Sequence, residues 1–157
     1  MQNNNLQDIY NFRPISAVLG SAGQPERDQF AAIQSAGYQV VINLAMPDST
    51  RAIPEEASLV REQGLEYVYI PVVWVEPQPS DLAAFFRAMD ERQDKKIFVH
   101  CAMNFRASAF VFLYRVMRQG VPLETARQDM LEIWEPNDIW QRFINGALAH
   151  SAGSSKD

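Results

Sequence analysis

The sequence is poor in the residues that build disulfides and metal sites. Its 157 residues include one cysteine, Cys101, and two histidines, His100 and His150. A single cysteine excludes a disulfide within the chain and fits a reducing compartment, so we expect a cytoplasmic protein. One cysteine and two well-separated histidines do not make a zinc site. We therefore expect no metal, and no other cofactor is indicated.

Long apolar runs and clusters of positive charge are also missing. No apolar stretch approaches the roughly 20 residues that a membrane span needs. The Asn-rich start, residues 1–6, lacks the basic and apolar regions of a signal peptide. The net charge is −5, and no basic stripe appears. We expect neither nucleic acid nor a membrane as partner. Because the net charge is negative, a bound anion would need a site with local positive charge.

Strand and helix patterns alternate along what we expect to be one domain, residues 1–157, with a core at about 12–148 and flexible ends. Helix patterns separate the strand patterns, which lie at 15–25, 38–44, 65–72 and 96–101. This alternation predicts an α/β fold with a central, mostly parallel sheet of four to five strands flanked by helices. Ligands of such sheets bind beyond the carboxyl ends of the strands.

One strand pattern ends directly at Cys101, and the helix pattern that follows it is apolar almost all round. Unpaired N–H groups and the helix dipole make a helix start an anion site, which favours the thiolate, the nucleophilic form of cysteine. The guanidinium of Arg106 can hold two oxygens of a phosphate-like group. Most lone cysteines are small core residues, and that reading of Cys101 stays open.

The stretch "HCAMNFRAS", with the helix patterns after it and "GYQVVINL" and "YIPV" before it, resembles the cysteine-dependent protein tyrosine phosphatases. The similarity is greatest to the dual-specificity branch and to small bacterial phosphatase-like proteins, and it covers about residues 12–148. It implies a phosphatase-like fold and a hydrolase that cleaves phosphate monoesters through a cysteinyl-phosphate. The substrate would be a phosphorylated small molecule or a phosphoprotein.

The resemblance also assigns residues. Cys101 would be the nucleophile and Arg106 the oxyanion ligand, and the substrate would lie over the loop between them, which consists of Ala102, Met103, Asn104 and Phe105. That loop is one residue shorter than in the family, which would limit activity. Asn104 stands where glycine is frequent, and asparagine tolerates the positive φ of a tight turn. His100 is expected to point inward and to orient the loop, since neighbours on a strand face opposite ways. Ala107 stands where the family has a hydroxyl that helps the sulfur to leave, and Ser108 is expected to substitute for it. Asn137 is expected in the same supporting layer.

The general acid has no obvious position. In the family an aspartate closely follows the "IP" strand, but here apolar residues follow Pro71. Three acids are candidates: Glu76 in a Pro-rich turn, Asp81 in the first turn of a helix, and Asp48 after another strand end. Each also has an ordinary interpretation, as a solvated charge, a helix-start acid and a turn residue respectively.

Two other functions remain compatible with the sequence. Six residues from Cys101 to Arg106 is the loop length of rhodanese-like sulfurtransferases, which would carry a persulfide on Cys101. A non-catalytic module that binds phosphate or a phosphoprotein would need only the anion-binding loop and Arg106. The helices after the loop look less like those of the sulfurtransferases, so phosphatase chemistry is the leading hypothesis.

Overall fold

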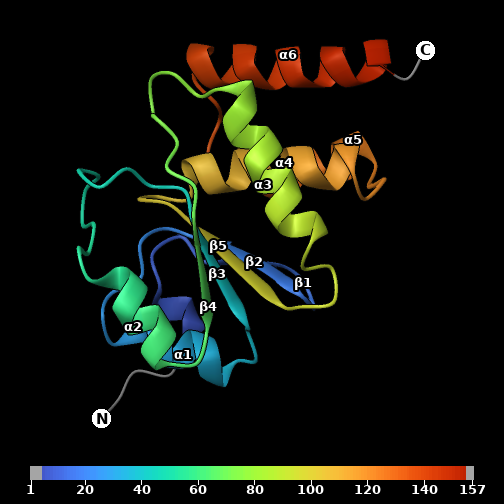
Figure 1. The fold of residues 1–157 in the computed structure, drawn as a ribbon. Helices are drawn as coiled ribbons and strands as arrows, with labels where there is room; N and C mark the ends of the chain where they lie inside the picture. Colours follow the sequence, from blue (N-terminus) through green and yellow to red (C-terminus); the bar gives the residue numbers. More distant parts are fainter. Residues whose placement is uncertain (1–4, 155–157) are drawn as a thin grey trace.

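The computed structural model describes residues 5–154 and has a five-stranded sheet at its centre (Figure 1). The strands are β1 (Arg13–Ser16), β2 (Leu19–Ala22), β3 (Val40–Asn43), β4 (Glu66–Tyr69) and β5 (Ile97–His100), in the order β1-β2-β5-β3-β4. Only the edge strand β1 is antiparallel to its neighbour. The expectation of a mostly parallel α/β sheet is confirmed.

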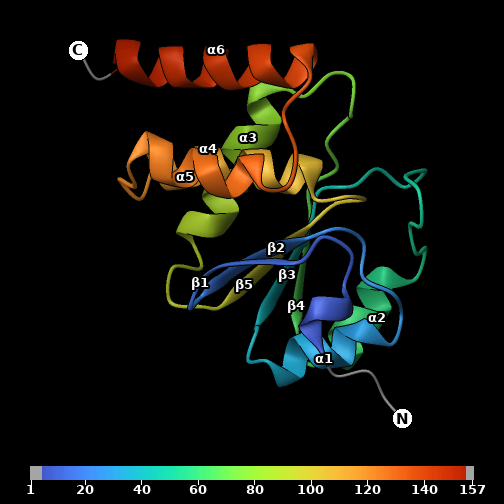
Figure 2. The same cartoon turned by 180° about the vertical axis from the view of Figure 1, so that it is seen from behind.

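Helices cover both faces of this sheet. The 3-10 helix η1 (Leu6–Asp8), α1 (Gln29–Ser35) and α2 (Glu56–Glu62) lie on one face. On the other face lie α3 (Pro79–Asp90), α4 (Phe105–Met117), α5 (Leu123–Leu131) and α6 (Asp138–Ser154) (Figure 2). Each parallel connection therefore carries a helix, as parallel strands require.

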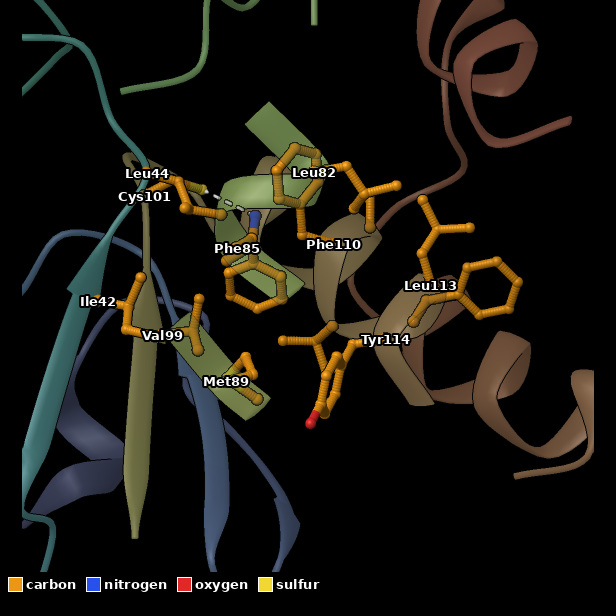
Figure 3. Packing of buried hydrophobic residues seen from close by; sticks show 14 of the residues in the cluster. Ile42, Leu44, Leu82, Phe85, Met89, Val99, Cys101, Phe110, Leu113 and Tyr114 are labelled. Carbon is orange, nitrogen blue, oxygen red and sulfur yellow. Dashed lines mark hydrogen bonds between the residues drawn. The ribbon is translucent and has the colours of Figure 1, made fainter. Parts of the chain in front are cut away.

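Alternating side chains of the central strands build two separate cores, because successive residues of a strand point to opposite faces. Val41 and Phe98 pack toward α1 and α2, whereas Ile42 and Val99 pack toward the layer that contains α3 and α4. In the second core, Val99, Phe85 and Phe110 lie together beside Cys101 (Figure 3). The alternation continues past the end of β5 and decides where His100 and Cys101 point.

Three details differ from the sequence-based expectation. The pattern at 15–25 contains the end of β1, a turn and β2, and the two strands form a hairpin. The first helix begins at Gln29 and not at Pro25. Finally, α6 extends to Ser154. Of the ends expected to be flexible, residues 1–6 and 150–157, residues 1–4 and 155–157 lie outside the described part. Among the described helices, none is long and apolar enough to cross a membrane.

Candidate active site

The candidate site lies beyond the carboxyl ends of three neighbouring strands. Ala22 of β2, His100 of β5 and Asn43 of β3 share one level of the sheet. Cys101 follows His100 directly, and α4 begins four residues later at Phe105. The predicted sequence of strand, cysteine, short loop, arginine and helix is therefore present.

Cys101 forms the floor of a hollow and packs against the core below it. Its side chain is 1% exposed, and its Sγ accepts a hydrogen bond of 3.4 Å from the N–H of Ala107 in the first turn of α4 (Figure 3). A helix N–H that points at sulfur stabilises negative charge on it. Burial alone would suit a core residue, but Cys101 also lines the pocket described below.

The loop after Cys101 turns two of its carbonyl groups away from that hollow. The carbonyl oxygen of Cys101 lies 3.1 Å from Nδ1 of His100, and that of Ala102 accepts from the N–H of Gln24 at 2.9 Å. In a planar trans peptide the C=O and the following N–H point in opposite directions. The N–H groups of Ala102 and Met103 are consequently directed away from these anchored carbonyls.

Arg106 joins the two walls of the hollow. Its guanidinium donates to the carbonyl of Val72 at 2.9 Å and to Oγ of Ser49 at 3.4 Å, and it lies 5.9 Å from the ring centroid of Trp74. The residue is 6% exposed, so the charge is held inside the site and not in bulk solvent. A guanidinium has five N–H donors, which leaves several for an oxyanion.

A buried ion pair supports the loop from the opposite face of the sheet. His100 is fully buried, and its Nε2 lies 2.7 Å from Oε2 of Glu56, the first residue of α2. Gln24 donates to the other carboxylate oxygen at 2.7 Å. Both ring nitrogens of His100 thus face oxygen atoms, Oε2 of Glu56 and the carbonyl of Cys101.

The ionisation of Glu56 follows from these contacts. Burial raises the pKa of Glu56, but the charge and the hydrogen bond of His100, together with hydrogen bonds from Gln24 and Tyr67, outweigh burial and leave the pKa below the ordinary value. Burial also raises the pKa of Tyr67, and the Glu56 charge raises it further. The carboxylate therefore stays ionised beneath the loop.

The hollow above Cys101 has a volume of about 480 Å³, within the usual range of roughly 300–1,000 Å³ for ligand pockets. Its walls are mostly apolar, and its polar groups are few; it is lined by Met46, Asp48, Ser49, Thr50, Val73, Trp74, Val75, Cys101, Ala102, Met103, Phe105 and Arg106. The side chains of Trp74 and Phe105 belong to an aromatic cluster with Trp134 and Trp140. Nε1 of Trp140 donates to the carbonyl of Trp74 at 2.8 Å, which fixes that wall.

The three candidate acids fall in different places. Asp48 lies in the loop after β3 and lines the pocket, and among the described lining residues it carries the one carboxylate. Asp81 accepts from the N–H of Gln78 at 3.0 Å and so caps α3. Glu76 is exposed in the turn before α3 and is not among the lining residues.

Two expected supporting residues, Ser108 and Asn137, make hydrogen bonds within the helical layer. Ser108 donates to the carbonyl of Phe105 and accepts from Nε1 of Trp134 at 3.0 Å, so its hydroxyl is oriented within the helical layer. Asn137 accepts from the N–H of Trp140 and stabilises the start of α6.

Sequence reasoning missed Glu56, Gln24 and Asn11. Asn11 donates to the carbonyl of Met103 at 3.0 Å, from a segment before β1. One signal existed for Glu56: it lies four residues before the buried Val60, on the same face of α2, so a carboxylate occupies a core-facing position. Among the described residues, no cluster of three or more potential ligands could hold a metal ion.

Residues 7–141 match the sequence model of the family described as "DSP-PTPase phosphatase fused to NAD+ Kinase". The chain belongs to this family. It is a member of the cysteine-dependent tyrosine and dual-specificity phosphatase superfamily, and the resemblance inferred from the sequence is confirmed.

Several solved structures and curated proteins are also similar to this chain. A phosphatase-type protein (DUF442) from Shewanella putrefaciens CN-32 is 37% identical, with a TM-score of 0.84 over 93% of this chain and 96% of that chain. Kinase associated phosphatase shares the fold at 11% identity, with a TM-score of 0.78 over 93% of this chain and 98% of that chain. A "Beta-lactamase hydrolase-like protein" of Xylella fastidiosa is 30% identical over 106 residues, which is 66% of this chain and 24% of that protein. The chain thus spans about a quarter of the curated relatives it matches.

Proposed function

We propose that this protein hydrolyses phosphate monoesters through a covalent phosphoryl intermediate on Cys101. The observation that carries the proposal is the placement of Cys101 and Arg106 in one pocket, with Ala107 donating to the sulfur. Membership of a phosphatase family supports the same chemistry. The substrate is a phosphorylated small molecule or a phosphoprotein whose phosphate reaches the floor of the pocket.

The first step transfers the phosphoryl group to sulfur. The thiolate of Cys101 attacks phosphorus, an S–P bond forms, and the bond from phosphorus to the leaving oxygen breaks. Negative charge on the equatorial oxygens is stabilised by the guanidinium of Arg106 and by backbone N–H groups at the start of α4. In the second step water attacks phosphorus, the S–P bond breaks, and inorganic phosphate leaves with the thiolate restored.

Asp48 is the proposed general acid. As a carboxylic acid it protonates the leaving oxygen, and as a carboxylate it then accepts a proton from the attacking water. Its position among the lining residues supports this assignment over Glu76, which lies outside them, and over Asp81, which caps a helix. The loop after β3 would thus supply the group that is missing after Pro71.

Trapping the intermediate tests the proposed function. The protein is mixed with an aryl phosphate, quenched in acid within one turnover, and digested. We expect the peptide that contains Cys101 to gain the mass of one phosphoryl group. Hydrolysis of the ester without that modification would contradict the covalent mechanism. No hydrolysis, combined with transfer of sulfur from thiosulfate to cyanide, would instead support the persulfide alternative.

Asp48→Asn should reduce hydrolysis in proportion to the difficulty of the leaving group. For an alkyl phosphate we expect kcat/KM to fall by about 10²–10⁴-fold, because general acid catalysis contributes on that scale. For a nitrophenyl phosphate, whose leaving group needs no proton, the loss should be under about tenfold. Steady-state kinetics on a series of esters gives the slope of kcat/KM against the leaving-group pKa. A steeper slope for Asp48→Asn than for the wild type is the expected result.

Glu76→Gln is the matched control. Like Asp48→Asn it removes one exposed carboxylate, here from the turn before α3. Its leaving-group dependence should equal that of the wild type. If Glu76→Gln steepens the dependence and Asp48→Asn does not, the acid has been assigned to the wrong loop.

A further inference from the structure

Two asparagines, one within the active-site loop and one in the segment before β1, adopt left-handed backbone conformations. Asn11 has φ 51°, and Asn104, the N-cap of α4, has φ 72°. A side chain other than glycine is uncommon at such angles, although asparagine is tolerated best. Two such residues in contact with one another call for a physical reason.

The two residues bind each other's chain segments. Nδ2 of Asn11 donates to the carbonyl of Met103 at 3.0 Å. In return, Nδ2 of Asn104 donates to the carbonyl of Asn11 at 2.9 Å and to Oγ of the buried Ser21 at 3.1 Å. We call this reciprocal pair, Asn11 with Asn104, the asparagine clasp.

The clasp completes the anchoring of the loop carbonyls. The carbonyls of Cys101 and Ala102 are held by His100 and Gln24, and the clasp holds the third, that of Met103. A left-handed residue next to a helical one gathers successive N–H groups into a concavity that binds anions. Asn104 followed by α4 has this combination.

Glycine at position 104 would supply the backbone angle without strain, so the side chain needs a separate explanation. Asn104 is fully buried, and its Oδ1 has no hydrogen-bond partner among the described residues. A buried unpaired acceptor is unfavourable, because it gives up its hydrogen bonds to water and gains none in return. The two bonds from Nδ2 therefore hold the loop at a cost in stability.

We infer that Asn11 and Asn104 are positioning residues, which shape the loop between Cys101 and Arg106 for a tetrahedral oxyanion. The inference rests on the proposed function in its choice of ligand. It explains how a loop with four residues between cysteine and arginine presents its N–H groups: anchors outside the loop hold its carbonyls in place. Asn104 acts through the backbone, not by touching the substrate.

Asn104→Gly tests the inference because it keeps the backbone angle and removes the two bonds that Nδ2 donates, to the carbonyl of Asn11 and to Oγ of Ser21. We expect the dissociation constant for inorganic phosphate, measured by calorimetry, to rise about tenfold, and KM for an aryl phosphate to rise with it. Asn11→Gly should have a similar effect. The double variant should lose less than the product of the two single effects, because both residues hold one loop.

The thermal midpoint of Asn104→Gly should remain near that of the wild type, since the unpaired Oδ1 is removed together with the two donors. Asn145→Ala, an exposed asparagine on α6, is the control and should leave phosphate binding unchanged. Unchanged phosphate affinity in Asn104→Gly, or two fully multiplicative single effects, would overturn the inference.

The phosphate measurement also separates the inference from the proposed function. If the wild type binds phosphate and fails to hydrolyse any aryl phosphate, the catalytic proposal fails while the clasp is still judged by binding. If neither the wild type nor Asn104→Gly binds phosphate, the clasp has no oxyanion to position. The inference about the clasp then fails.

Discussion

Cys101→Ser is expected to abolish hydrolysis of an aryl phosphate, with a loss in kcat of at least about 10⁴-fold. A serine hydroxyl at this position is far less nucleophilic than a thiolate, and among the described residues of the pocket no histidine is present to activate it. The change should be measured with a chromogenic aryl phosphate under conditions where the wild type turns over many times.

The same variant should still bind phosphate, because Arg106 and the loop N–H groups remain in place. Calorimetry with inorganic phosphate is the control for an intact site. Equal hydrolysis by the wild type and Cys101→Ser would rule out Cys101 as the nucleophile. Phosphate binding by a wild type that never hydrolyses an ester would favour the alternative of a non-catalytic binding module.

Glu56→Ala is expected to destabilise the protein by about 3–5 kcal/mol, the usual result of breaking a buried ion pair by removing one partner. Both side chains of the pair are buried, with exposures of 0% for His100 and 2% for Glu56, and the variant leaves His100 and Gln24 without their acceptor. Because domains are stable by only about 5–15 kcal/mol, this loss should be evident in urea unfolding at neutral pH.

The neighbouring residue provides a matched control. Glu55 pairs with Arg27 on the surface, where both side chains are about half exposed or more, so Glu55→Ala should change the unfolding free energy little. Comparable losses for Glu55→Ala and Glu56→Ala would show that the buried pair contributes no more than a surface pair.

The Glu56 interaction also has a pH dependence of defined sign. The pKa of Glu56 in the folded protein lies below the ordinary 4.5, so the folded state binds fewer protons than the unfolded chain in this range. Its stabilising contribution is complete above pH 4.5 and is lost as the pH falls through the folded pKa. Glu56→Gln should therefore flatten the decline of stability below about pH 4.5, as measured by urea unfolding.

Local patterns were sufficient to predict the mostly parallel sheet and the order of strand, cysteine, short loop and helix around Cys101. The buried strand β5, the apolar helix α4 and the turn-prone Asn104 lie within a single stretch of sequence, where periodicity and chain direction decide the outcome. The same alternation predicted that His100 would point away from Cys101. It points toward Glu56, and Cys101 packs on the face of α4.

Contacts between distant segments could not be predicted in this way. Asn11 and Asn104 are 93 positions apart, and Glu56 and His100 are 44 apart, so their pairing depends on how β2, β3 and β5 assemble. The pocket position of Asp48 has the same origin, because the loop after β3 reaches Cys101 only once β3 has paired with β5. Strand order settles these contacts, and local composition contains little information about it.

The two-faced arrangement of β5 has a practical consequence for altering selectivity. The ion pair of His100 and Glu56 lies in the opposite layer of the sheet from the pocket. The rim of the pocket is formed by Met46, Asp48, Ser49, Thr50, Val73, Trp74, Val75, Met103 and Phe105. Directed evolution toward new esters can therefore randomise exposed rim positions such as Val73, Val75 and Met103. These side chains can be varied without changing the layer on the opposite face of the sheet. Such a library would leave Cys101 and the contact between His100 and Glu56 unchanged.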